Sequence, residues 1–221
     1  MAKLLVEYIE SSELQYIKEE TEDKKKRYHL KGIYAQSEIK NKNKRLYSKD
    51  LLEREVKKLN EDKISKNACY GACDHPQSPI VTLKDASHLI TKLVMDGNDA
   101  IGEAVIIDTE GAGRSLMACI DAGGRLMMST RGIGTLSEVT GQDHKKVNSD
   151  WKWITTDAVS DGSAAGAVVE AILEQKEWMI SGQDYVEVAV EKLQKQVDNK
   201  FNSSLATMYL KQFIQSIRKG N

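Results

Sequence analysis

Two apolar stretches joined by a tight-turn signal constrain the fold of this chain more than any other feature. The stretches are His88–Met95 and Ala100–Ile107, and Asp96–Asp99 links them with the sequence Asp-Gly-Asn-Asp. Because an Asp-Gly pair tolerates the positive φ angles of a tight turn, we expect the two stretches to form a β-hairpin. The middle of the chain is therefore predicted to be β-structure.

Further strand patterns lie on both sides of this hairpin. Leu4–Ile9 is a short apolar run, and Tyr28–Ala35 mixes β-branched and aromatic residues with polar ones. The charged stretch Lys18–Arg27 between them is predicted to be a solvated turn or loop. Leu126–Ser129 and Trp151–Thr155 are predicted to be later strands.

Two helices and one structured loop are predicted between these strands. Ser48 is placed to cap a helix whose apolar residues share one face. Those residues are Leu51, Leu52, Val56 and Leu59. Arg114–Asp121 is predicted to be a short helix that ends at Gly123. Cys69–Pro79 contains both of the chain's two prolines and is predicted to be a structured loop.

The pattern changes after about residue 163. Ala164–Trp178, Asp184–Lys200 and Ser204–Arg218 have helical spacing and no strand signal. A β-rich body followed by a helical tail indicates an α+β fold. We expect two domains, residues 1–163 and residues 164–221, with the tail either packed on the body or used for docking and oligomerisation.

Composition excludes several classes of protein. With 32 basic and 33 acidic residues the net charge is −1, which argues against a chain built mainly to coat nucleic acid or an anionic membrane. No apolar run approaches the roughly 18–20 residues of a membrane span, and Glu7 interrupts the first apolar run before a signal-peptide core could form. Three cysteines are an odd number, which argues against a secreted disulfide scaffold. We expect an intracellular protein with neither a nucleic-acid nor a membrane partner.

His75 is the first candidate catalytic residue. A histidine can act as a general base near neutral pH. Pro76 restricts His75 to extended geometry and stiffens the loop at a side chain that catalysis would need to hold in place. The alternative is a turn histidine that caps the end of a strand.

Ser129 is the second candidate. It ends an apolar strand and precedes a segment with an arginine and two glycines, Thr130-Arg131-Gly132-Ile133-Gly134. Glycines let backbone N–H groups approach a ligand, and an arginine can stabilise developing negative charge, as acyl transfer requires. A glycine-containing hairpin beside an arginine is the alternative.

A catalytic histidine also needs a carboxylate that orients it. Asp157 follows the Trp151–Thr155 strand, and Asp161 comes shortly after it. Either residue could instead be a turn or capping carboxylate. From local sequence alone the choice between them stays open.

A zinc site is a weaker alternative in the same region. Cys69, Cys73 and His75 offer three potential ligands, but a structural tetrahedral site needs a fourth at suitable spacing. Cys119 and His144 are available only at a distance. We therefore expect no metal and no cofactor.

Taken in order along the chain, four segments resemble a known family. They are Asn41-x-Asn43-x-Arg45-x-Tyr47 before a helix, Asp74-His75-Pro76, Ser129-Thr130-Arg131-Gly132-x-Gly134 and Asp157-Ala158-Val159. Their order and spacing are similar to those of the T4-like prohead proteases of tailed bacteriophages, which share a fold with the herpesvirus assemblins. The resemblance covers roughly residues 28–168. Thr130 stands where relatives often have a second serine, and Cys69–Cys73 is not part of the pattern.

The resemblance implies a serine endopeptidase with a compact β-barrel body flanked by helices. Ser129 matches the nucleophile, His75 the general base and Asp157 the third member of the triad, which favours Asp157 over Asp161. We infer an oxyanion or substrate-binding role for the segment after the nucleophile. That segment comprises Thr130, Arg131, Gly132 and Gly134.

The resemblance also implies where and on what the enzyme acts. It would lie inside the immature capsid, in the cytoplasm of the infected bacterium, and act there as a homo-oligomer on scaffold (core) proteins and major capsid protein precursors. Such relatives cut after glutamate in a Leu/Ile-x-Glu pattern and cleave themselves. Ile172-Leu173-Glu174 is our candidate autocleavage site, with the cut after Glu174.

Two other functions compete with this one. The first is a catalytically inactive capsid or scaffold component that retains the protease fold, and the second is a zinc-stabilised nucleic-acid-binding module. The presence together of His75, Ser129 and Asp157 favours the enzyme, since an inactive relative has no need to keep all three.

Overall fold

The computed structural model describes residues 2–8, 14–20, 26–76, 78–107, 111–160, 177–181 and 184–188. The chain divides into two compact units, Met1–Val186 and Glu187–Asn221. Almost all described residues belong to the first unit. In the part of the chain that is described, no helix is long and apolar enough to cross a membrane.

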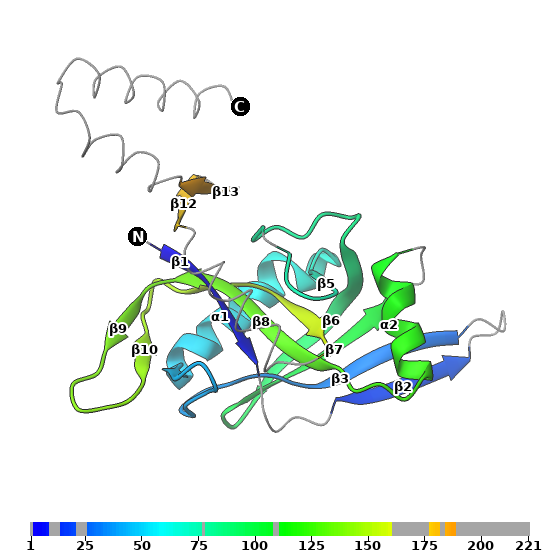
Figure 1. Cartoon of the computed structure of the whole chain (residues 1–221), viewed down its shortest axis with the longest axis horizontal. Coiled ribbons are helices and arrows are strands. Elements are labelled where there is room, and N and C mark those ends of the chain that lie inside the picture. Colours follow the sequence, from blue (N-terminus) through cyan, green and yellow to red (C-terminus); the bar gives the residue numbers. More distant parts are fainter. Residues whose placement is uncertain are drawn as a thin grey trace, which may run out of the picture. The chain divides into compact units, whose positions relative to one another are not determined.

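One five-stranded sheet contains the strand of the candidate nucleophile. Its order is β11-β8-β1-β12-β13. The strands are β1 (Ala2–Tyr8), β8 (Met127–Gly134), β11 (Lys152–Val159), β12 (Glu177–Ser181) and β13 (Asp184–Val188). β8 pairs antiparallel with β1 on one side and with β11 on the other (Figure 1). The candidate nucleophile therefore lies on an internal strand.

The second five-stranded sheet has the order β2-β3-β7-β6-β5 and contains the predicted central hairpin. Its strands are β2 (Gln15–Glu20), β3 (Lys26–Gln36), β5 (Tyr70–Ala72), β6 (Ala86–Asp96) and β7 (Asp99–Ile106). Asp96 and Asp99 face each other across the turn, where Gly97 has a φ of +61°. The hairpin is therefore confirmed.

A three-stranded sheet has the order β4-β10-β9. It consists of β4 (Arg45–Leu46), β9 (Leu136–Glu138) and β10 (Lys145–Val147). Among the described residues the strand pairing forms these separate sheets and no closed barrel. The α+β class is confirmed, and the barrel stays a prediction.

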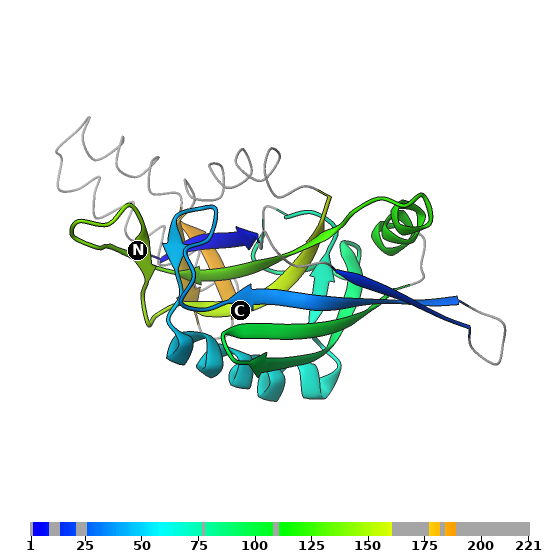
Figure 2. The ribbon, with the colours of Figure 1, turned by 90° about the horizontal axis from the view of Figure 1, so that it is seen from below.

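In the described part of the chain, two α-helices flank the sheets. α1 (Lys49–Asp62) lies beside β6 and β11, and α2 (Ala112–Asp121) lies beside β6 and β7 (Figures 1 and 2). A short 3₁₀ turn, η1 (Ile64–Lys66), follows α1. Ser48 occupies the N-cap position of α1, but its side chain makes no capping hydrogen bond. All four predicted apolar residues of α1 are buried, and each buried side chain of this size contributes about 1.5–3 kcal/mol.

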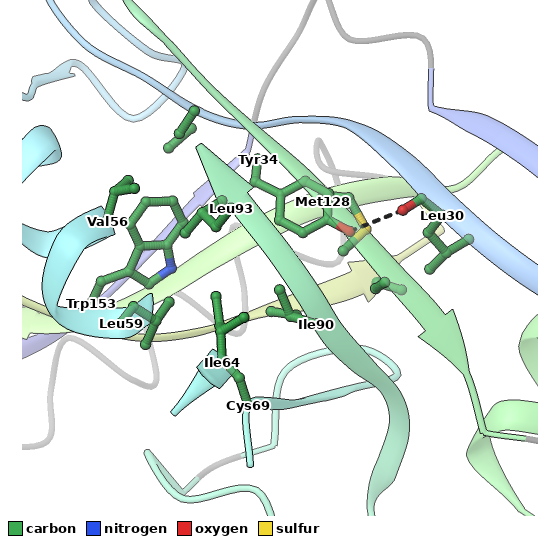
Figure 3. Packing of buried hydrophobic residues seen from close by; sticks show 14 of the residues in the cluster. Leu30, Tyr34, Val56, Leu59, Ile64, Cys69, Ile90, Leu93, Met128 and Trp153 are labelled. Carbon is green, nitrogen blue, oxygen red and sulfur yellow. Dashed lines mark hydrogen bonds between the residues drawn. The ribbon is translucent and has the colours of Figure 1, made fainter. Parts of the chain in front are cut away.

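One hydrophobic core joins both large sheets to α1. Figure 3 shows side chains of α1, β3, β6, β8 and β11 meeting in it. Tyr34 is fully buried there, and its hydroxyl donates a hydrogen bond to the carbonyl of Leu30 at 3.2 Å. The residues labelled in the figure include Val56, Leu59, Ile90, Leu93, Met128 and Trp153. This packing fixes β8 and β11 relative to each other and to the helix.

Two predicted loops are wrong in part. The charged stretch Lys18–Arg27 contains the end of β2 and the start of β3, whose register places Glu19 opposite Arg27. The backbone pairing of β2 with β3 therefore extends into the charged stretch. Within Cys69–Pro79, Tyr70–Ala72 form β5, because their backbones pair with β6.

The predicted helical tail is also wrong where the structure describes it. Glu177–Ser181 and Asp184–Val188 are strands β12 and β13, and β12 pairs antiparallel with β1. Both segments are rich in aromatic and β-branched residues, which favour strands over helices. The rest of the tail, including Ile172–Glu174, lies outside the described residues. The division into domains at residue 163 stays a prediction.

Candidate active site

The structure brings His75, Ser129 and Asp157 together from three separate segments. Ser129 lies on β8 directly opposite Asp157 on β11. His75 lies on the loop after β5, between the two side chains. Asp161, the competing carboxylate, lies outside the described residues.

His75 bridges the other two side chains. Its Nδ1 lies 2.7 Å from Asp157 Oδ2, and its Nε2 lies 2.8 Å from Ser129 Oγ. An ionised carboxylate can only accept, so Nδ1 carries the hydrogen and the Nε2 lone pair faces the serine hydroxyl. Ser129 and Asp157 are fully buried, and the His75 side chain is 2% exposed.

The loop that holds His75 is fixed to β11 beside Asp157. Cys73 forms a parallel bridge with Ala158, and the Asp74 N–H donates to the Ala158 carbonyl at 2.8 Å. Asp74 has a φ of +58°, a left-handed conformation that aspartate adopts more readily than most residues. The chain therefore changes direction immediately before His75.

Arg131 pairs with Asp157 in the protein interior. Its Nη2 donates to Asp157 Oδ1 at 2.9 Å, and its Nε lies 2.9 Å from Oδ2 without the alignment of a hydrogen bond. Arg131 Nη1 also donates to the carbonyl of Ser78, on the loop after His75. Burial alone would raise the pKa of Asp157, but Arg131, His75 and the Ala72 N–H together hold that pKa below its usual range. The carboxylate is therefore ionised and held by several donors.

The segment predicted to line an oxyanion site is enclosed by neighbouring strands. Thr130–Gly134 pairs with β1, and Thr130–Ile133 pairs on its other side with β11, with a register shift between Trp153 and Thr155. A Cβ added at Gly132 would lie 2.3 Å from Trp151 Nε1, and one added at Gly134 would lie 2.6 Å from Trp151 Cα. Both glycines therefore make room for Trp151. The oxyanion role of this segment stays a prediction.

The buried His88, which contacts the residue before Asp157, was not predicted from the sequence. It is fully buried, with its Nε2 3.0 Å from the Thr156 carbonyl and its Nδ1 2.9 Å from Ser87 Oγ. Burial lowers the pKa of His88, so the imidazole is neutral and donates from Nε2. A Cβ added at Gly71 would lie 2.1 Å from this nitrogen, so the glycine admits the ring.

Glu7 on β1 was missed as well. Its buried carboxylate accepts hydrogen bonds from four side chains of the Asn41–Tyr47 segment, which precedes α1. The donors are Asn41 Nδ2 at 2.5 Å, Asn43 Nδ2 at 3.0 Å, Arg45 Nη1 at 2.8 Å and the Tyr47 hydroxyl at 2.8 Å. Four donors in that short segment indicate a buried acceptor, but the sequence did not show which residue supplies it.

The cysteines near the site are free thiols. Burial raises the pKa of the Cys69 and Cys73 thiols to about 11 in each case, so both are protonated near neutral pH. Within the described ranges, no group of three or more histidine, cysteine, aspartate or glutamate side chains is placed to hold a metal ion.

Comparison with known proteins gives the family. The family model described as "Prohead core protein serine protease" matches residues 6–177. The chain belongs to this family. All three candidate catalytic residues fall inside the matched region.

Individual members of the prohead core protease family agree with this assignment. The chain is 38% identical over 144 residues to the prohead core protein protease of Enterobacteria phage T4, a match that covers 64% of this chain and 67% of the relative. The solved structure of the bacteriophage T4 capsid assembly protease, gp21, is similar with a TM-score of 0.66 and 29% identity. That match covers 72% of this chain and 98% of the solved one.

Proposed function

We propose that this prohead core protease is a serine endopeptidase in which Ser129 is the nucleophile, His75 the general base and Asp157 the orienting acid. The observation that supports this best is His75 bridging Ser129 Oγ at 2.8 Å and Asp157 Oδ2 at 2.7 Å. Both distances are in the range that proton transfer and imidazole orientation require. The three residues lie on β8, on β11 and on the loop after β5. Their proximity is therefore a result of the fold and not of closeness along the chain.

The proposed mechanism proceeds through an acyl-enzyme. Ser129 Oγ attacks the peptide carbonyl while His75 Nε2 takes its proton, and His75 then gives that proton to the leaving amine. Water hydrolyses the ester, again with His75 as base. Asp157 stays ionised and keeps the hydrogen of His75 on Nδ1.

Arg131 acts on the acid and does not touch the nucleophile. It occupies Asp157 Oδ1 and lies against Oδ2, so the carboxylate cannot rotate away from His75. It also pairs with the Asp157 charge, which would otherwise be very costly in a fully buried site. We assign Arg131 as a positioning residue.

The family membership supports a role in capsid maturation. The T4 relative is a capsid assembly protease by name. We propose that this chain digests scaffold proteins and trims major capsid protein precursors inside the immature capsid of a phage, as a homo-oligomer. Cleavage after glutamate in Leu/Ile-x-Glu is the proposed specificity.

The test compares wild type with Ser129→Ala on a peptide that contains Leu-x-Glu. Cleavage by wild type and none by the variant is expected, because the hydroxyl is the attacking group. Alanine is slightly smaller than serine and fits the same buried position, so we expect the variant to keep its fold, and its melting temperature checks this. Equal cleavage by both proteins would refute the assignment of the nucleophile.

Self-cleavage after Glu174 is proposed as a late, inactivating event. Mass spectrometry of incubated wild type should find a fragment that ends at Glu174, and Ser129→Ala should not produce it. Absence of this fragment while the peptide is still cut would exclude the site.

A further inference from the structure

The hydroxyl of Ser129 has a second partner besides His75. Ser129 Oγ lies 2.9 Å from the main-chain carbonyl oxygen of Glu7, as well as 2.8 Å from His75 Nε2. Figure 1 shows β1 lying along β8, and the register places Glu7 opposite Thr130 and Tyr8 opposite Ser129. The end of β1 therefore contacts the reacting atom of the proposed nucleophile.

The side chain of the same residue anchors this strand. The Glu7 carboxylate is buried and accepts from Asn41, Asn43, Arg45 and Tyr47. Side chains alternate along a strand, so the Glu7 side chain lies on the other face of the sheet from the Ser129 side chain. Its four donors lie on that same other face. We call Glu7 and these four donors the Glu7 clamp.

We propose that Glu7 is a positioning residue that restrains the nucleophile in a resting state, and that the Glu7 clamp holds its carbonyl in place for this. The inference rests on the proposed function of Ser129 and His75. It gives a purpose to the Asn41–Tyr47 segment, which the catalytic mechanism leaves unused.

The Ser129 hydroxyl has a single hydrogen for two acceptors. A hydroxyl has one hydrogen, and it cannot donate to His75 Nε2 and to the Glu7 carbonyl at the same time. When Ser129 has been acylated it has no hydrogen at all, and two oxygen lone pairs face each other at the Glu7 contact. The contact therefore stabilises the free enzyme and is lost in the reaction, and an interaction of that kind slows the chemical step.

The two contacts also differ in what they do for the reaction. A Ser129 hydroxyl that donates to His75 Nε2 is placed to give up its proton, whereas one that donates to the Glu7 carbonyl is not. Weakening the carbonyl as an acceptor should therefore favour the reactive arrangement.

The most direct test replaces the amide between Glu7 and Tyr8 by an ester in the full chain. An ester carbonyl is a weaker acceptor than an amide carbonyl, and the side chains of the Glu7 clamp stay intact. The assay measures the rate of labelling by a fluorophosphonate between pH 5 and pH 8.5. In that reaction Ser129 Oγ forms a bond to phosphorus, fluoride leaves and His75 takes the hydroxyl proton.

Two side-chain variants complete the comparison. Tyr47→Phe removes one donor of the clamp and keeps the aromatic ring, which lies 4.9 Å from the ring of Trp151. Leu5→Val is the matched control, because Leu5 is fully buried on the same strand and contributes nothing to the clamp. Ser129→Ala gives the background labelling.

We expect the ester to raise the plateau rate by about 2- to 12-fold, the range that one neutral hydrogen bond spans. Tyr47→Phe should raise the plateau rate by less, and Leu5→Val should leave it unchanged. An unchanged or lower plateau rate in the ester protein, with wild type labelled at Ser129, overturns this inference alone. No labelling of Ser129 in any protein refutes the proposed function as well.

Discussion

The pairing of Arg131 with Asp157 gives the sharpest prediction about stability. Arg131→Met removes the guanidinium and keeps a long apolar stem of similar reach. Asp157 is then left as a fully buried carboxylate with His75 and the Ala72 N–H as remaining partners. Breaking a buried ion pair by removing one partner typically costs about 3–5 kcal/mol. That is a large part of the roughly 5–15 kcal/mol by which a domain is stable.

The dependence of this loss on pH separates the charge effect from packing. In wild type the pKa of Asp157 is lowered, so its stabilising effect is present above the unfolded value of about 3.9 and is lost only as pH falls through the depressed folded value. Burial raises the pKa of Asp157, and without Arg131 fewer partners oppose that effect, so the pKa rises. In the variant Asp157 therefore takes up a proton at a pH where Asp157 of wild type is still ionised, and the cost of the buried charge disappears. The difference in free energy of unfolding between wild type and Arg131→Met should be largest near pH 7. It should decrease at lower pH by up to about 1.4 kcal/mol per pH unit.

Urea unfolding followed by tryptophan fluorescence at several pH values measures this difference. Both proteins should carry Ser129→Ala so that self-cleavage does not interfere. Adding Asp157→Asn to Arg131→Met removes the unpaired charge and should restore at least about 1 kcal/mol at pH 7, because the cost of the buried carboxylate disappears. A loss that is the same at every pH, with no recovery in the double variant, would refute the electrostatic reasoning and leave only the lost contact with Ser78.

Two further substitutions test the packing around the site. Gly132→Ala places a Cβ 2.3 Å from Trp151 Nε1 and 2.7 Å from the Lys152 carbonyl, so we expect a loss of about 1–3 kcal/mol or more, read as a lower melting temperature. A melting temperature equal to that of wild type would contradict the close packing of this strand. His88→Gln removes a buried imidazole whose pKa is lowered by burial, and the unfolded chain binds a proton below about pH 6.5 that the folded chain does not. Wild type should therefore lose more stability than the variant between pH 7 and pH 5 in urea titrations, and parallel losses would show that His88 does not titrate on unfolding.

The central hairpin could be predicted because its information is local. An Asp-Gly pair and two apolar stretches lie within the range 88–107 and need no distant partner to be recognised. β5 could not be predicted in the same way. It has three residues, and only its pairing with β6 makes it a strand. β13 was predicted as a helix because its alternating residues precede a segment that also has helical spacing.

The candidate site shows the same limit at the level of side chains. The three residues His75, Ser129 and Asp157 could be selected by their chemical type and by a family resemblance. The partner of Arg131 could not be predicted, since a sequence does not show whether an arginine faces a substrate or a buried carboxylate. Glu7 was missed because its side-chain donors lie 34 to 40 positions away in the chain.

The wide separation of the site residues along the chain has a consequence during synthesis. Glu7 and Ser129 are separated by 122 positions, and His75 and Asp157 by 82. Pairings this distant form late, and the chain emerges from the ribosome with its N-terminus first. A nascent chain that ends before β11 has the serine and the histidine but not the carboxylate that orients them. Under the proposed mechanism, the chain can therefore cleave peptide bonds only after it has been synthesised beyond Asp157.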